Sequence, residues 1–454
     1  MSQLQKHSQI PGRELRPGRA PSLEEQTRRK VSRRILPFFF ALYIISYLDR
    51  ANVSFAKAAM SADLGFSEAV YGFGAGIFFV GYLLLEIPGA LIVERWSARL
   101  WMSRILITWG LCTILVGFAR TPVQFYGARF CLGLAEAGFF PGVLVYLTHW
   151  FAPGDRARAM SSFILAVPIS FVIGAPLSAF CLSLHWFGLA GWQWLFILQG
   201  LPAVFFGILT PFYLIDRPAD ARWLQSAERD WLSTELKRER EHKRLLGHFS
   251  VRSVLGRGSV WILAAALFFV VLSSYGYILW LPSTIQRESG LSVKASTLLS
   301  ALPFCAAAIM VKLMGRSSDR SGEHKLHAAL PLFAAGLLFA GVAIPGQPFP
   351  LTMLWLVMTG SLLWAWAPPF WVLPTLSLGE SGAAASLGLI NSVGNLGGFV
   401  GPSIIGYFLA NGHSYWFITL LCSGGFMISG ALILLTSVPG RDRTLVNKVV
   451  DSSL

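Results

Sequence analysis

The chain has 454 residues, of which 54% are hydrophobic and only 13% are charged. The two or three soluble domains that this length suggests would need more surface charge, and the 34 Phe and 16 Trp residues exclude a disordered chain. The five cysteines lie singly in apolar runs without metal-ligand or redox spacing, so we expect no metal site and no cofactor. The composition therefore favours a membrane protein.

Twelve apolar stretches are each long enough to cross a bilayer as a helix of about 20 residues. A soluble all-helical core would need polar faces at helical period, which these stretches lack. The first stretch is too long for a signal peptide, so we expect it to stay in the mature protein. We predict an all-α membrane protein with twelve transmembrane helices, at residues 35–56, 71–93, 101–119, 124–148, 159–181, 191–215, 259–284, 296–315, 326–345, 351–376, 384–410 and 414–438.

Lys and Arg residues are distributed unevenly between the loops on the two sides of these helices. When the loops are assigned to alternate sides from the N-terminus, one side carries 30 of them and the other only four, which are Lys57, Arg120, Arg287 and Lys294. The positive-inside rule then places the 30-charge side and both termini in the cytoplasm, with the chain in the cell (inner) membrane. The net charge of +14 is thus mostly a topology signal spread over six loops, and we expect no nucleic-acid binding.

The spans divide into two sets of six. The predicted domains are a cytoplasmic tail (1–34), an N-terminal six-helix bundle (35–215), a cytoplasmic linker (216–258), a C-terminal six-helix bundle (259–438) and a second cytoplasmic tail (439–454). The linker contains an amphipathic stretch at 224–246, which we expect to be a solvated helix. An acid followed by arginine comes after the second span and again after the eighth, as an internal duplication predicts: Glu94-Arg95 and Asp319-Arg320.

Several motifs stand at matching places relative to the spans. The loop after the eighth span reads Gly-x-x-x-Asp-Arg-x-Gly-x-x-Lys from Gly315 to Lys325, and its first copy is degenerate. Four further segments are 47–56 in span 1, 133–142 in span 4, 216–224 after span 6 and 391–399 in span 11. Together they resemble the major facilitator superfamily and, within it, the anion:cation symporter family. The resemblance implies a fold of two six-helix halves and transport of tartrate, sugar acids or aromatic carboxylates.

Charged residues inside the predicted spans carry the functional argument. Each costs roughly 2.5–3.5 kcal/mol at mid-depth, so it should face protein or a water-filled cavity. Arginine can donate two parallel hydrogen bonds to a carboxylate, and we therefore expect Arg50 and Arg129 to bind the anion. Asp49 and Glu136 are the candidates for proton coupling, and the resemblance implies the same four roles. The alternative is that these residues only form ion pairs between spans 1 and 4.

Other side chains complete the predicted machinery. The substrate site also includes hydroxyl, amide and indole groups, from Tyr47, Tyr82, Asn391 and Trp371. We expect the two acid–arginine loops to pair across the cytoplasmic rims of the halves as a conformational gate, through Glu94, Arg95, Asp319 and Arg320. The middle of span 5, around Val167, is wholly apolar where some sugar-acid carriers have glutamine. This departure favours a smaller or more apolar carboxylate.

The sequence therefore predicts a monomeric secondary transporter that couples a small organic anion to protons by alternating access, with the proton gradient as its energy source. An exporter or exchanger on the same fold is an alternative, because direction depends on gradients. A transporter-like membrane sensor is a more distant one, since both tails are too short for a signalling domain. We expect no enzyme, because no nucleophile with its base, pair of catalytic acids or set of metal ligands is recognisable.

Overall fold

The computed structural model describes residues 22–95, 97–245 and 255–436, and the regular secondary structure in these ranges is helical. Its elements are α1 (Leu23–Leu64), α2 (Glu68–Arg95), α3 (Ala98–Val116), α4 (Pro122–Glu136), α5 (Phe139–Thr148), α6 (Pro153–Cys181), η1 (Trp186–Gly188), α7 (Gly191–Tyr213), η2 (Pro218–Asp220), α8 (Ser226–Leu245), α10 (Gly258–Ser289), α11 (Val293–Leu299), α12 (Ala301–Ser321), α13 (Lys325–Gly341), α14 (Phe349–Leu362), α15 (Ala367–Phe370), α16 (Leu373–Ala410) and α17 (Tyr415–Leu435).

The predicted transmembrane helices are present. Among the described residues, ten helical segments are long and apolar enough to cross a membrane, and two shorter apolar ones, Leu165–Cys181 and Lys325–Gly341, fall on predicted spans 5 and 9. Helix α1 begins well before the predicted start of span 1, because the Ser22 hydroxyl accepts a hydrogen bond from the backbone amide of Glu25 and caps it.

Three predicted spans are each divided in two. Span 4 consists of α4 and α5, which are separated at Ala137 and Gly138, and Gly138 has a φ of +84° that favours glycine. Span 8 consists of α11 and α12. Span 10 consists of α14 and the short α15, where Pro368 and Pro369 lack the amide protons that a continuous helix needs. The break in span 4 places Glu136 at the end of a helix in the interior of the molecule.

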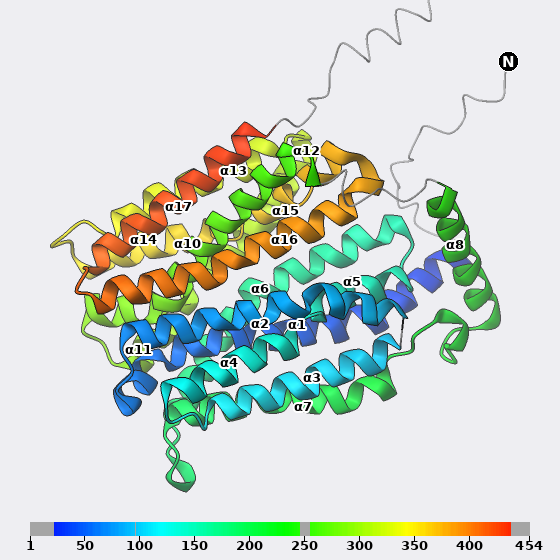
Figure 1. Cartoon of the computed structure of the whole chain (residues 1–454). Helices are drawn as coiled ribbons and strands as arrows, with labels where there is room; N and C mark the ends of the chain where they lie inside the picture. The colour runs from blue at the N-terminus through cyan, green and yellow to red at the C-terminus, as the bar shows by residue number, and fades with distance from the viewer. Residues whose placement is uncertain (1–21, 96, 246–254, 437–454) are drawn as a thin grey trace, which may run out of the picture.

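The helices form two halves, α1–α7 and α10–α17, which lie side by side (Figure 1). In the first half, α3 packs on α7 and α2 on α4. In the second half, α10 packs on α16, and α13 on α17. The halves meet where α2 contacts α16, α1 contacts α10, and α6 contacts α11 and α12. The exact domain limits remain a prediction, and the tails before residue 22 and after residue 436 lie outside the described residues.

Helix α8 marks one end of the molecule, which we call the α8 end (Figure 1). It is amphipathic as expected, but it is docked rather than fully solvated. Lys30 of α1 pairs with Glu228 at 2.6 Å, and Arg156 of α6 pairs with Glu239 at 2.6 Å. The opposite end, which we call the Glu68 end, carries the α1–α2 connection.

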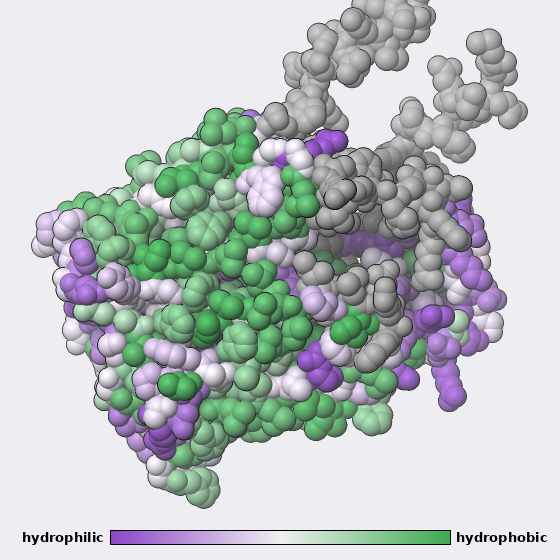
Figure 2. All heavy atoms as spheres, viewed as in Figure 1, coloured by the Kyte–Doolittle hydropathy of each residue, from purple (hydrophilic) through white to green (hydrophobic). Residues whose placement is uncertain are grey.

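The surface between the two ends is predominantly hydrophobic, whereas polar side chains gather at the ends and over α8 (Figure 2). Many large apolar side chains in this zone are exposed, for example Phe212 at 80% and Leu337 at 65%. A soluble protein rarely leaves so much contiguous apolar surface in water, so this band fits a lipid environment.

Candidate functional site

The predicted residues Arg50 and Glu136 form a buried ion pair between α1 and α4. Both Nε and Nη2 of Arg50 approach the same Oε1 atom of Glu136, at 2.9 and 2.8 Å, and the Ser46 hydroxyl donates to that atom at 2.7 Å. Glu136 is only 1% exposed. Its Oε2 atom is buried and has no hydrogen-bond partner among the described residues. One oxygen of this carboxylate is therefore fully engaged and the other is free to take a proton or a donor.

Aromatic rings surround the Arg50 guanidinium. Its central carbon lies 5.3 Å from the ring of Tyr47, 5.4 Å from that of Phe78 and 5.0 Å from that of Tyr82. Ring faces attract cations, most strongly when both are out of water. The second half also reaches this region, because Tyr275 of α10 is close enough to interact with Arg50 electrostatically, and the Trp364 ring is 6.1 Å from that of Tyr47. The structure thus brings Tyr47, Tyr82 and Arg50 together where the halves face each other.

Asp49 lies at a different interface from its neighbour Arg50. The two positions are about 100° apart on the helix, and Asp49 faces α3. Its Oδ2 accepts hydrogen bonds from the Trp109 indole and, at 2.8 Å, from the Thr113 hydroxyl, and its Oδ1 accepts one from Asn52 at 3.0 Å. Asp49 is buried, with 1% exposure. Its role in proton coupling stays a prediction.

Arg129 is buried beside α2, and no ion pair or hydrogen bond joins it to Glu136 in the described part of the chain. Its Nε and Nη2 donate to the carbonyl oxygens of Gly74 and Ala75 at 3.4 and 3.3 Å, and its guanidinium lies 5.0 Å from the Phe78 ring, which also contacts Arg50. Nη1 is buried without a partner among the described residues. A buried cation whose only hydrogen bonds are long contacts to carbonyl oxygens can still bind an anion. Its substrate role stays a prediction.

Asn391 connects the two halves. Its amide donates to Oε1 of Glu86 on α2, and the neighbouring Ser392 hydroxyl donates to Oε2 at 3.2 Å. Sequence reasoning selected Asn391 as a substrate ligand and left Glu86 out. Trp371 is half-buried, and its ring makes an edge contact with Phe370 within the second half. Neither contact tests the predicted substrate roles.

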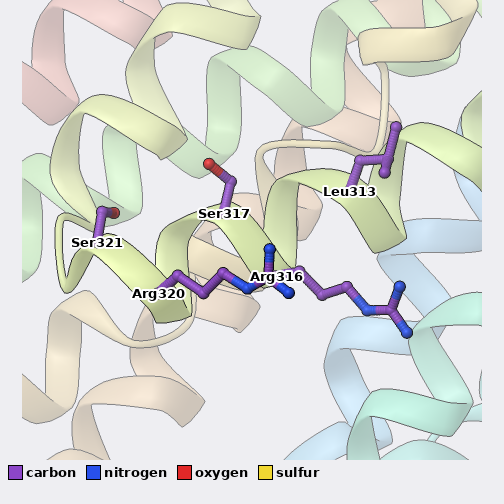
Figure 3. A pocket seen from close by; sticks show the side chains of 5 residues that line it. All are labelled: Leu313, Arg316, Ser317, Arg320 and Ser321. Atoms are coloured by element: carbon purple, nitrogen blue, oxygen red, sulfur yellow. The ribbon is translucent and has the colours of Figure 1, made fainter.

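The predicted gating residues are only partly described. The side chains of Glu94 and Arg95 lie outside the described part, so their pairing is untested. Asp319 and Arg320 are exposed at the α8 end of α12, and neither forms an ion pair with any other described residue. Arg320 and Arg316 extend along and away from α12 over a groove of about 460 Å³, which Leu313, Ser317 and Ser321 also line (Figure 3).

Sequence reasoning missed the donors around Asp49 and the hydroxyl of Ser46. Trp109 and Thr113 are one helical turn apart in an otherwise apolar stretch, a spacing that puts both on one face. That pattern was the available signal, but it does not identify which helix the face meets. Within the described residues, no group of three or more His, Cys, Asp or Glu side chains could hold a metal ion.

Comparisons with known proteins agree with this architecture. A family model described as Major Facilitator Superfamily matches residues 39–402. The chain is 42% identical over 419 residues to a putative tartrate transporter of Agrobacterium vitis, which covers 91% of this chain and 93% of the relative. It is 38% identical over 386 residues to a quinolone resistance transporter of Acinetobacter baumannii, with 84% and 88% covered.

Solved structures show the same fold. A bacterial homologue of the human lysosomal transporter Spinster, in an inward-facing and occupied conformation, superposes with a TM-score of 0.70 at 17% identity, covering 92% of this chain and 98% of that one. The family match spans most of the chain, and the relative from Agrobacterium vitis covers nearly all of it. The chain therefore belongs to the Major Facilitator Superfamily, and it is a multi-pass membrane transporter rather than an enzyme.

Proposed function

We propose that this protein is a proton-coupled symporter of a small organic anion that works by alternating access. The observation that carries the proposal is the Arg50–Glu136 pair, which is buried between α1 and α4 with one carboxylate oxygen free. A charged pair in this position is costly to bury and is not needed to hold two apolar helices together.

The geometry supports a direct link between proton and anion. Arg50 uses two nitrogens to hold Oε1 of Glu136. A proton that binds the free Oε2 neutralises the carboxylate and weakens its hold on the guanidinium. The released guanidinium can then donate two parallel hydrogen bonds to a substrate carboxylate. Loss of the proton reverses these steps and expels the anion, so that each ligand favours binding of the other.

Neighbouring groups would shape the anion site. Tyr47 and Tyr82 lie against Arg50 and can offer hydroxyl groups to the substrate, while Arg129 supplies a second positive charge beyond Phe78. Asp49 is a second proton candidate, because an acid held by neutral donors can change its charge without breaking an ion pair. Asn391 and Trp371 would belong to the site contributed by the second half.

The names of the relatives support an organic acid as cargo, because the Agrobacterium vitis protein is a putative tartrate transporter. For orientation we propose that the α8 end is cytoplasmic, since the loops that the sequence assigns to that side carry 30 Lys and Arg, against four in the loops assigned to the other side. Both termini then lie in the cytoplasm, and the Glu68 end faces outward. We further propose that the protein acts as a monomer, with the paired acid–arginine loops as its cytoplasmic gate.

The test is uptake of carboxylates, tartrate among them, into proteoliposomes under an imposed pH difference. A difference of one pH unit supplies about 1.4 kcal/mol per proton, which is about tenfold accumulation for one proton per monovalent anion. We expect accumulation when the outside is acidic, and its loss on adding a protonophore. Uptake that never exceeds equilibration, with the gradient intact, would contradict symport.

Export or exchange is the second candidate, because the relative from Acinetobacter baumannii is named a quinolone resistance transporter. The same proteoliposomes distinguish the two. An exporter that exchanges its cargo for protons accumulates substrate only when the lumen is acidic, which is the opposite gradient.

A further inference from the structure

A second cross-half cluster lies at the Glu68 end, outside the Arg50–Glu136 site. It borders a cavity of about 490 Å³ at the seam between the halves. Side chains from α1 and α2 of the first half and from α10 and α17 of the second half line this cavity, among them Lys57, Glu68, Arg287 and Tyr415. Sequence reasoning used Lys57 and Arg287 only to assign the topology and gave none of the four a role in transport.

The Glu68 carboxylate is the centre of the cluster. Its Oε1 accepts from Lys57 of its own half at 3.0 Å and from the Tyr415 hydroxyl of the other half at 3.2 Å. Its Oε2 accepts from the Trp280 indole of the other half at 3.0 Å. One carboxylate thus joins α1 and α2 of the first half to α10 and α17 of the second half, and these two pairs must separate if this end of the molecule opens.

Lys57 makes the cluster depend on the charge of Glu68. The residue is 4% exposed, and Glu68 is the only carboxylate paired with it among the described residues. Its ammonium otherwise contacts the ring faces of Tyr71, Trp280 and Tyr415, at 5.3, 5.1 and 6.0 Å. A buried ammonium that loses its carboxylate is strongly destabilised, and water is then its best partner.

Adjacent contacts show that this end is closed. The Ser54 hydroxyl donates to the carbonyl oxygen of Ile278 at 2.7 Å, and the Tyr71 hydroxyl lies 3.3 Å from the carbonyl oxygen of Leu279. Both contacts cross the seam between the halves. A methyl group at Gly72 of α2 would overlap the backbone of α16 at Pro402, so these two helices also touch directly.

We propose that Glu68 closes the outer gate of the transporter as a carboxylate and that its protonation opens the gate. This inference rests on the alternating access of the proposed function. Neutral Glu68 no longer attracts Lys57 and holds Trp280 and Tyr415 more weakly, so the buried ammonium drives the seam apart to reach water. The gate therefore opens more at lower pH on the outer face, where protons enter together with the anion.

Other charges near Glu68 do not change the sign of this effect. Arg287 of α10 lies 3.8 Å from the ring of Tyr415 and pairs with the exposed Glu288 at 2.7 Å. Its charge adds to that of Lys57, so the two cations repel each other more once Glu68 is neutral. The phenols of Tyr71 and Tyr415 stay uncharged over the pH range in which a carboxylate titrates.

The experiment measures the gate without substrate, so its outcome does not depend on which anion is carried. Spin labels are attached to cysteines at the exposed positions Ala62 and Leu291, in a background that lacks the native cysteines. Pulsed electron resonance then reports the distance across the seam at pH 7.5 and at about pH 4, where an ordinary glutamate is largely protonated. We expect a short distance to dominate at pH 7.5 and a longer one to grow at the lower pH.

Three conservative variants test the carboxylate directly. Glu68→Gln should show the longer distance at both pH values, with the pH response lost. Tyr415→Phe keeps the ring but removes one donor to a charged group, and should raise the ratio of open to closed populations roughly tenfold at pH 7.5. Tyr407→Phe removes a hydroxyl from an exposed tyrosine of the same half and should leave the distances as in the parent protein.

Two results would overturn the proposal. One is a Glu68→Gln protein that keeps the parent's distances or its pH response. The other is an equal shift in Tyr415→Phe and Tyr407→Phe, which would mean that loss of any hydroxyl loosens this half. Failure of symport in liposomes would leave these distances unchanged, so the two proposals fail separately.

Discussion

Asp49 of α1 and Glu136 of α4 are both buried carboxylates, but Glu136 is paired with a cation, whereas Asp49 is held by neutral donors. At Asp49 both oxygens accept hydrogen bonds, from Trp109, Thr113 and Asn52. At Glu136 all contacts go to Oε1, and Oε2 has no partner among the described residues. Both oxygens of Asp49 are therefore satisfied, whereas Oε2 of Glu136 keeps an unused capacity to accept a hydrogen bond or a proton.

The comparison indicates where exchange of ligands is easiest. A proton can bind Oε2 of Glu136 without displacing a hydrogen bond, but a change at Asp49 rearranges three donors. We infer that Glu136 exchanges its proton with the substrate site and that Asp49 responds more slowly, through movement of α1 against α3. Replacing each carboxylate by its amide removes the charge and keeps the shape of the side chain. The effects of the two substitutions can therefore distinguish the roles of the two sites.

The largest effect should come from Glu136→Gln. The glutamine oxygen can still accept from Arg50, and its NH₂ group fits where Oε2 has no partner, so the protein should fold normally. It cannot carry a proton, and we expect pH-driven accumulation to disappear while binding of the anion remains. Uptake with and without a pH gradient measures this. A variant that still accumulates its substrate would remove Glu136 from the coupling mechanism.

Arg50→Lys should weaken the anion affinity by roughly 10- to 100-fold, since an ammonium cannot reproduce the two parallel hydrogen bonds of a guanidinium. Isothermal titration calorimetry with a transported carboxylate gives the affinity. Arg99→Lys, at an exposed arginine of α3, is the matched control and should bind as the parent does. Equal affinities in all three proteins would contradict a substrate role for Arg50.

Asp49→Asn should be less stable than Glu136→Gln by about 1–3 kcal/mol in its free energy of unfolding. The new NH₂ group must point at a donor, because the indole and hydroxyl on one oxygen and the Asn52 amide on the other are all donors. Thermal unfolding in detergent compares the two variants. We also expect Asp49→Asn to retain exchange without proton-driven accumulation, and a fully coupled, equally stable variant would count against this account.

Thr113→Val should have the smallest effect, about 1 kcal/mol of stability, because Trp109 still donates to the same oxygen of Asp49. Transport should be nearly unchanged. The melting temperature and the initial rate of uptake check both points. A large loss of transport without loss of stability would show that the Asp49 cluster is itself part of the pathway.

The fold could be predicted from the sequence because apolar length and the Lys and Arg asymmetry depend only on composition along the chain. The proline-rich break in span 10 was also foreseeable. The break at Gly138, which leaves Glu136 at a helix end, could not be predicted. Glycines are common in membrane helices, and most of them serve close packing rather than a break.

The site could be predicted only in part. A charge inside an apolar span is conspicuous, which is why Arg50 and Glu136 were found. The hydrogen-bond partners of such a charge depend on how the helices rotate and pack. Periodicity therefore could not show that Asp49 accepts from Trp109 or that Arg129 donates to carbonyl groups of α2. Glu68 and Lys57 lie near span ends, where charges are ordinary, and only the structure shows that they lie together at the seam.

The central claim is that anion binding and protonation of Glu136 are one linked event. Calorimetric titration of a transported carboxylate in two buffers of different ionisation enthalpy counts the protons taken up per anion bound. We predict net proton uptake by the parent protein near neutral pH, and clearly less by Glu136→Gln. Binding without proton uptake in the parent, or the same uptake in both proteins, would contradict the mechanism.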